Sequence, residues 1–198
     1  MNLHDCDADP GQMSLCGSLG EYRTRVIALA EADTTDVVEQ VGPFYWTDDK
    51  NQRHEHFLDH VVFKSDGRRL GLTDKPFLRV TSAFEEEIRQ VYEDGRKLDV
   101  IDDLFLVTEF ARNPIKLHNA DLFRGCRDAD PDVDIIALTV VSKLAEDMPL
   151  KTLVAEINRG PRGFRALVRL IRSGVLQLKI EEKISLETIV LKVQVEYA

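Results

Sequence analysis

Residues 56–76 (HFLDHVVFKSDGRRLGLTDKP) constrain the fold of this chain more than any other stretch. Two runs rich in β-forming residues flank a Ser-Asp-Gly turn, a pattern that predicts a β-hairpin. Asp59 lies in the first strand, and Thr73, Asp74 and Lys75 end the second. Because side chains alternate between the faces of a strand, Thr73 and Lys75 are expected on one face and Asp74 on the other. Asp59 is expected to face Lys75 across the hairpin.

A helix is expected before this hairpin, over residues 18–33 (SLGEYRTRVIALAEAD). Its apolar residues recur at helical spacing, Ser18 is suited to cap it, and Glu21 falls in its first turn. Glu21 can therefore supply a second carboxylate to the hairpin. The other elements expected before residue 127 are strands at 36–41 and 43–46, a helix that ends just before Gly95, an inner strand at 102–110 and a helix at 113–126.

The acidic segment DADPD (128–132) is the expected domain boundary. Three helix-sized segments and two short strands follow it, which is the element order of a winged helix-turn-helix domain. The sequence thus predicts a flexible tail (1–16), an α/β domain with a mixed sheet flanked by helices (17–127), and a winged-helix domain (132–198).

Five arginines gather in and before the third of these helices, and no acidic residue falls between positions 157 and 174. The five are Arg159, Arg162, Arg165, Arg169 and Arg172. The last four recur at the spacing of one helix face. In a winged helix-turn-helix this helix enters the DNA major groove, and the arginine fork suits phosphate and guanine. An acidic protein partner would suit the same face, and a purely solvated face is the ordinary alternative.

Composition excludes some functions. The net charge of −9 argues against indiscriminate binding of nucleic acid, although the first 130 residues, with 16 Lys/Arg and 26 Asp/Glu, hold all of the acidic excess. No apolar run approaches the roughly 20 residues that span a bilayer, and the N-terminus does not resemble a signal peptide. Three cysteines without zinc-cluster spacing indicate reduced thiols. A cytoplasmic location without membrane contact is therefore expected.

The carboxylates and the lysine suit hydrolysis of a phosphodiester. Carboxylates can hold Mg²⁺ or Mn²⁺, which polarises the phosphate and activates a water molecule, while a lysine stabilises the developing charge. The ordinary alternative is an ion pair between adjacent strands. His54, His56 and His60 also follow one strand at even spacing, but no cysteine lies near them in sequence, so a zinc site there is the weaker interpretation.

The order of these pieces resembles the TnsA-type transposon end-cleaving endonucleases, which join a PD-(D/E)xK nuclease fold to a C-terminal winged-helix domain. The resemblance covers roughly residues 18–192 and is one of order and pattern. The matching features are a first helix with Glu21, a His-x-x-Asp strand (His56 and Asp59), an Asp-Gly turn, a strand that ends in Lys75-Pro76, and a Thr-Glu strand end before an Asn-containing helix (FLVTEFARNPIKLHNADLF).

The resemblance implies a restriction-endonuclease-like sheet and a Mg²⁺- or Mn²⁺-dependent DNA endonuclease that cleaves transposon ends. Its partners would be double-stranded DNA, a DDE-type transposase and an AAA+ ATPase regulator. Glu21, Asp59 and Lys75 would be catalytic, and Glu21, Asp59 and the Asp74 carbonyl would bind metal. The family places Glu or Gln where Thr73 stands, so Thr73 would act through its hydroxyl or a water molecule.

This departure keeps a second hypothesis open, namely a catalytically impaired nuclease-fold protein that binds DNA or assembles a complex. A transcriptional regulator whose front half senses a ligand is a third hypothesis, but the front half shows no sequence typical of a ligand-binding cradle.

Overall fold

The protein is described by a computed structural model that covers residues 16–48 and 50–193. It divides into two compact units, Met1–Asn113 and Pro114–Ala198. The division falls before the helix α3 (Pro114–Gly125) rather than in the acidic segment 128–132, because α3 packs on a helix of the second unit and contributes Leu122 and Phe123 to its core.

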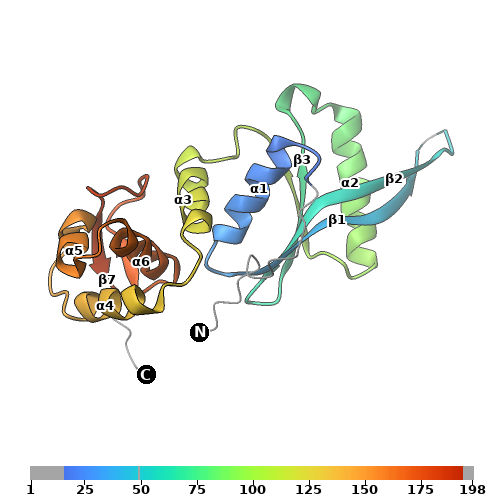
Figure 1. The fold of residues 1–198 in the computed structure, drawn as a ribbon. Coiled ribbons are helices and arrows are strands. Elements are labelled where there is room, and N and C mark those ends of the chain that lie inside the picture. The colour runs from blue at the N-terminus through green and yellow to red at the C-terminus, as the bar shows by residue number, and fades with distance from the viewer. Residues whose placement is uncertain (1–15, 49, 194–198) are drawn as a thin grey trace. The chain divides into compact units, whose positions relative to one another are not determined.

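The first unit is an α/β fold built on a mixed four-stranded sheet (Figure 1). Its elements are α1 (Leu19–Ala30), β1 (Thr34–Thr47), β2 (Arg53–Lys64), β3 (Arg69–Asp74), the 3₁₀ helix η1 (Phe77–Arg79), α2 (Ser82–Lys97) and β4 (Asp103–Val107). The strand order is β1-β2-β3-β4, with antiparallel pairing except between β3 and β4, which are parallel. The expected helix–strand–hairpin order and the mixed sheet are confirmed, but β4 is an edge strand of this sheet and not an inner one.

One helix covers each face of the sheet. Ala28 and Leu29 of α1 pack against Val62 on one face, here called the α1 face, while Val91 of α2 packs against Val61 on the opposite α2 face. Val61 and Val62 are neighbours in β2, so their side chains must point to opposite faces of the sheet. Alternate residues of the hairpin thus contribute to the hydrophobic core on both faces of the sheet.

The alternation breaks at Asp59. Leu58 and Val61 belong to the same buried cluster on the α2 face, although strict alternation would place them on opposite faces. Opposite this point, β1 has a positive φ of 52° at Gln40 and a register shift between Val41 and Phe44. This local irregularity of the two strands is typical of a β-bulge, which re-aims the side chains around it.

Side-chain caps define the N-termini of both helices that cover the sheet. The Ser18 hydroxyl accepts a hydrogen bond from the Glu21 amide of α1 at 3.1 Å, and the Thr81 hydroxyl accepts one from the Phe84 amide of α2 at 3.2 Å. Such caps satisfy amides that have no partner within the helix. The α1 cap was expected from the sequence. Gly95 was expected just past the end of the second helix, but it lies buried within α2, where an added Cβ would meet Ile101 at 2.8 Å.

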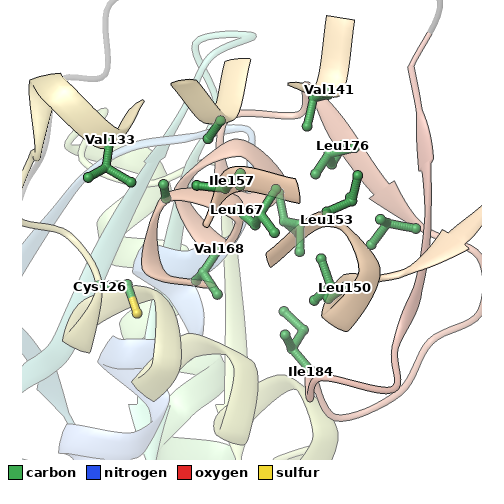
Figure 2. Close-up of a cluster of buried hydrophobic side chains, with 14 residues drawn as sticks. Cys126, Val133, Val141, Leu150, Leu153, Ile157, Leu167, Val168, Leu176 and Ile184 are labelled. Carbon is green, nitrogen blue, oxygen red and sulfur yellow. The ribbon is translucent and has the colours of Figure 1, made fainter. Parts of the chain in front are cut away.

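The second unit contains four helices and a small antiparallel sheet among its described residues. After α3 come α4 (Pro131–Ser142), β5 (Met148–Pro149), α5 (Leu150–Ile157), α6 (Pro161–Arg172), β6 (Leu176–Leu178) and β7 (Ile189–Lys192), with strand order β5-β7-β6. Figure 2 shows its core, in which Val133 and Val141 of α4 surround Leu153 of α5 and Leu167 of α6. Leu153 and Leu167 have at most 1% of their surface exposed, so this core is closed to solvent. Along residues 16–48 and 50–193, the helices lack the length and apolar character needed to cross a bilayer.

Candidate functional site

Asp59 lies where the pairing of β2 with β3 ends. The ladder between these strands stops at His60 and Leu72, and the Asp59 carboxylate then accepts the next backbone N–H, that of Asp74, at 2.6 Å. A side-chain carboxylate thus takes the place that a strand carbonyl would occupy. The irregular pairing of β1 and β2 next to Asp59 is consistent with this position of its side chain.

The Asp74 side chain is deeply buried on the α1 face, with 4% of its surface exposed. Its Oδ1 accepts hydrogen bonds from the Thr24 hydroxyl at 2.9 Å and from the Arg112 guanidinium, whose Nε also donates to Thr24 at 3.1 Å. Its Oδ2 is buried and has no hydrogen-bond partner. An orphaned buried carboxylate oxygen is a costly group that a bound cation can satisfy.

Glu21 approaches this pair from the first turn of α1. Its Oε2 accepts the Gly17 amide at 2.7 Å, which together with the Ser18 cap forms a reciprocal arrangement like a capping box. The negative charge of Glu21 acts on both Asp59 and His60, which places it at the same end of the α1 face.

The electrostatics of Asp59 reflect this crowding. Burial, together with the charges of Glu21 and Asp74, raises the pKa of Asp59 to about 6, although the Asp74 amide and His56 oppose the change. Carboxylates that share a partly desolvated site raise each other's pKa in this way. A cluster of this kind favours a cation that relieves the repulsion between its members.

Thr73 and Lys75 lie on the other face of β3, as the alternation predicted. The buried Thr73 hydroxyl is 3.3 Å from His56 Nε2, and His56 Nδ1 is 2.8 Å from a carboxylate oxygen of Glu87 on α2. The Lys75 ammonium lies 4.0 Å from the centre of the Phe84 ring, a cation–π contact. Lys75 and Asp59 form no ion pair, so the contact expected across the hairpin is not made.

The structure therefore separates the predicted residues into two groups. Glu21, Asp59 and Asp74 gather toward the α1 face, with Asp74 contributing its carboxylate rather than only the expected carbonyl. Thr73 and Lys75 face α2. No local pattern in the sequence indicates Thr24, Arg112 or Glu87, because each is brought in by tertiary packing from a distant helix or loop.

The three histidines of β2 do not share a site. His54 stacks on Trp46 with ring centres 4.2 Å apart, and His56 faces α2. His60 is 1% exposed and belongs to the α1 face, and burial lowers its pKa despite the opposing charges of Asp74 and Glu39. The break in alternation between Leu58 and Val61 separates His56 from His60, so the common face inferred from their even spacing does not exist.

Among the described residues, one group of three potential metal ligands has all its ligand atoms within 4.8 Å, and it is Cys16, Glu39 and His60. The Glu21, Asp59 and Asp74 oxygens are spaced more widely. A cation held by these three carboxylates would therefore require small side-chain movements or bridging water molecules.

The arginines of the second unit are not all available for an outside partner. Arg162 forms two hydrogen bonds of 2.7 Å with Asp130, and the pKa of Asp130 is lowered by them. Arg169 contacts Asp134 at 2.5 Å and donates to the Cys126 carbonyl at 2.9 Å. Because α4 packs on α6, acids distant in sequence pair with arginines that had no acidic neighbour within their own segment. Arg159 is exposed and Arg165 and Arg172 are half-buried.

The chain matches no protein-family model and no curated protein sequence.

Proposed function

We propose that this protein is a divalent-metal-dependent DNA endonuclease, similar in arrangement to the TnsA-type enzymes. In this proposal the first unit is a restriction-endonuclease-like nuclease domain that hydrolyses phosphodiesters. The second unit is a winged-helix domain that holds double-stranded DNA. A DDE-type transposase and an AAA+ ATPase regulator would be its partners at transposon ends.

One observation carries the proposal. Asp59, at the end of the β2–β3 ladder, has a pKa raised to about 6 beside Glu21 and Asp74, and Asp74 presents a buried oxygen with no partner. Three carboxylates, one of which has an unsatisfied buried oxygen, provide the hard, anionic donors that Mg²⁺ and Mn²⁺ prefer. The residues present therefore fit a divalent cation of this class.

Each residue has a defined task. Glu21, Asp59 and the Asp74 Oδ2 would hold the cation, while Arg112 and Thr24 orient Asp74 through its Oδ1. When bound, the metal would polarise the phosphate and lower the pKa of the attacking water. Lys75 would contribute positive charge to the phosphate oxygens after its ammonium leaves the Phe84 ring.

Thr73 is the point at which this site differs from the resembled family. Its hydroxyl is held next to the His56 imidazole, which Glu87 orients from α2. The pair formed by His56 and Glu87 would supply, through a hydrogen bond or a proton transfer, what the family's carboxylate supplies at position 73.

DNA binding would fall to the exposed part of the arginine face in the second unit. The helices α4, α5 and α6 followed by β6 and β7 have the order of a winged helix-turn-helix, with α6 in the place of the recognition helix. Arg159, at the exposed start of this helix, and Arg165 are suited to contact phosphate. Arg162 and Arg169 would instead position α6 on α4.

A specific observation favours a second candidate, a nuclease-fold protein that binds DNA without cutting it. Lys75 and Thr73 lie on the side of β3 opposite to Asp74, and the Lys75 ammonium makes a cation–π contact with Phe84. If this separation persists when DNA is bound, the cation would stabilise the fold or bind DNA. Lys75 would then not act on the same phosphate as the cation, and no cleavage would follow.

The experiment combines Mn²⁺ binding with DNA cleavage. Isothermal titration should show saturable Mn²⁺ binding that Asp59→Asn abolishes. The matched control Asp66→Asn changes an exposed carboxylate in the β2–β3 turn of the same hairpin and should leave binding unchanged. Supercoiled plasmid should be nicked with Mn²⁺ or Mg²⁺, with the proposed partners added if needed, and Lys75→Ala should remove the nicking.

The outcomes separate the two candidates. Metal binding lost in Asp59→Asn but no nicking under any condition supports the non-cutting protein. Wild-type Mn²⁺ binding that survives Asp59→Asn, or nicking that survives Lys75→Ala, contradicts the proposed endonuclease site.

A further inference from the structure

We propose that Cys16, Glu39 and His60 form a zinc-binding site on the α1 face, separate from the carboxylate cluster. Cys16 precedes α1, Glu39 lies in β1 and His60 in β2, so the site would join three segments of the first unit. This inference goes beyond the proposed function and does not depend on DNA cleavage.

The geometry fits a tetrahedral ion. The ligand atoms of the three residues lie within 4.8 Å of one another, and the Cys16 sulfur donates to Glu39 Oε1 at 3.6 Å. Bonds of about 2.3 Å from zinc to sulfur and about 2.1 Å from zinc to oxygen, at a tetrahedral angle, place the two ligand atoms about 3.6 Å apart. The sulfur and the oxygen therefore already stand at the separation that a shared zinc ion requires.

His60 supplies an independent observation. Its side chain is buried, with 1% of the residue exposed, and its Nδ1 has no hydrogen-bond partner. Buried imidazole nitrogens in proteins are normally paired, and a metal ion is one of the partners that satisfies them. The unsatisfied nitrogen belongs to the same residue that completes the three-ligand group.

The surroundings balance the charge of such a site. A zinc ion with one thiolate and one carboxylate is neutral, and Arg25, whose Nε lies 2.8 Å from Glu39 Oε1, adds one positive charge beside that carboxylate. The negative charges of Asp74 and Glu21 act on His60 at the same time and offset Arg25. The pocket can therefore hold the ion without an unpaired buried charge.

The chemical types of the three ligands indicate which metal the site would bind. A thiolate and an imidazole favour zinc, whereas Mg²⁺ takes oxygen ligands in an octahedral arrangement. The two sites would also communicate, since Gly17 follows Cys16 directly and its amide holds the Glu21 carboxylate at 2.7 Å. Zinc at Cys16 would thus fix the start of α1 and, through it, the position of Glu21.

Cobalt titration of the metal-free full chain tests the site without any activity assay. In a Cys6→Ser background, a Co²⁺ ion at this site should give a sulfur-to-cobalt charge-transfer band and intense visible bands typical of tetrahedral coordination, and Zn²⁺ should remove these bands while excess Mg²⁺ should not. Cys16→Ser should lose the charge-transfer band. Glu39→Gln should keep the band and weaken affinity about tenfold or more.

Two matched variants control the measurement. Cys126→Ser removes the buried thiol of the second unit, and Asp59→Asn removes a ligand of the proposed Mg²⁺ site; both should keep the cobalt spectrum. Far-UV circular dichroism verifies that each variant is folded. A wild-type chain that shows no charge-transfer band, or a folded Cys16→Ser chain that retains it, overturns the proposal. Loss of Mn²⁺ binding alone bears only on the proposed function.

Discussion

The two units of this protein handle their charges in opposite ways. In the second unit, arginines of α6 pair with acids at the start of α4, since Arg162 pairs with the N-cap residue Asp130 and Arg169 with Asp134. On the α1 face of the first unit, the described network has four carboxylates and two guanidinium groups. Its members are Glu21, Glu39, Asp59, Asp74, Arg25 and Arg112. Oppositely charged side chains that pair with each other stabilise the fold. An excess of negative side chains instead favours the binding of a positively charged ligand.

Burial makes this difference consequential. An exposed ion pair contributes little to stability because water screens it, but a buried carboxylate that loses its partner is strongly unfavourable. The Arg112 and Asp74 side chains are 12% and 4% exposed, while Arg162 is 57% exposed. Substitutions of buried and half-buried charged residues in each unit test this contrast.

The largest effect is expected for Arg112→Ala, which leaves Asp74 buried without its cation. We expect the free energy of unfolding of the first unit to fall by about 3–5 kcal/mol. The single tryptophan of the chain, Trp46 in β1, reports on this unit in urea titrations followed by fluorescence. Arg79→Ala, at an exposed arginine of η1, is the control and should change little. A loss as small as that of the control would show that Asp74 does not depend on Arg112.

An intermediate effect is expected in the second unit for Arg169→Ala. This half-buried side chain contacts both Asp134 and the Cys126 carbonyl, so its removal should lower stability by about 2 kcal/mol. Hydrogen exchange of the buried amides of Ala166 and Val168 measures it. Arg162→Ala, whose ion pair is exposed, should leave this exchange nearly unchanged. Equal effects of the two substitutions would show that the burial of Arg169 does not make its contacts more stabilising than the exposed ion pair of Arg162.

The smallest effect, of opposite sign, is expected for Asp59→Asn. Because the folded-state pKa of Asp59 is raised to about 6, the protonated form is favoured by folding. Its contribution to stability is present below about pH 4 and is lost as the pH rises to about 6. The full difference corresponds to about 3 kcal/mol, and solvent at this half-buried residue reduces it to about 1–2 kcal/mol.

Metal-free Asp59→Asn should therefore be more stable than the wild type at pH 7 by about 1–2 kcal/mol and similar at pH 4. Trp46 fluorescence in urea at both pH values measures the difference. Mn²⁺ should stabilise the wild type and not the variant. A variant that is less stable than the wild type at pH 7 would show that the Asp59 carboxylate is not strained by its neighbours.

Much of the first unit was predictable because its signals are local. Ser18 and Glu21 identified the start of α1, and the Ser-Asp-Gly turn identified the β2–β3 hairpin. The alternation at Thr73, Asp74 and Lys75 was also correct, since β3 is regular there. Gly95 misled the prediction of a helix end, because a close contact with Ile101, distant from any local pattern, is what requires glycine at that position.

The candidate site was predictable only in part. The irregular pairing of β1 with β2 next to Asp59 leaves no mark in the period of either strand, so His60 was grouped on one face with His54 and His56, whereas it lies on the α1 face. Arg112 and Thr24 reach Asp74 from positions 38 and 50 residues away. The acids that pair with Arg162 and Arg169 are the N-cap residue of α4 and a residue of its first turn, and no pattern within the α6 segment could reveal them.

The hydrogen bond from the Asp74 amide to the Asp59 carboxylate also makes the end of the β2–β3 ladder sensitive to the ionic state of a side chain. A backbone amide that donates to an ionised carboxylate resonates differently from one that donates to a protonated or metal-bound carboxyl group. The nuclear magnetic resonance signal of this one amide would therefore follow the titration of Asp59 near pH 6 and the arrival of a cation. The backbone amide of Asp74 in β3 would thus report on the ionic state of the Asp59 carboxylate.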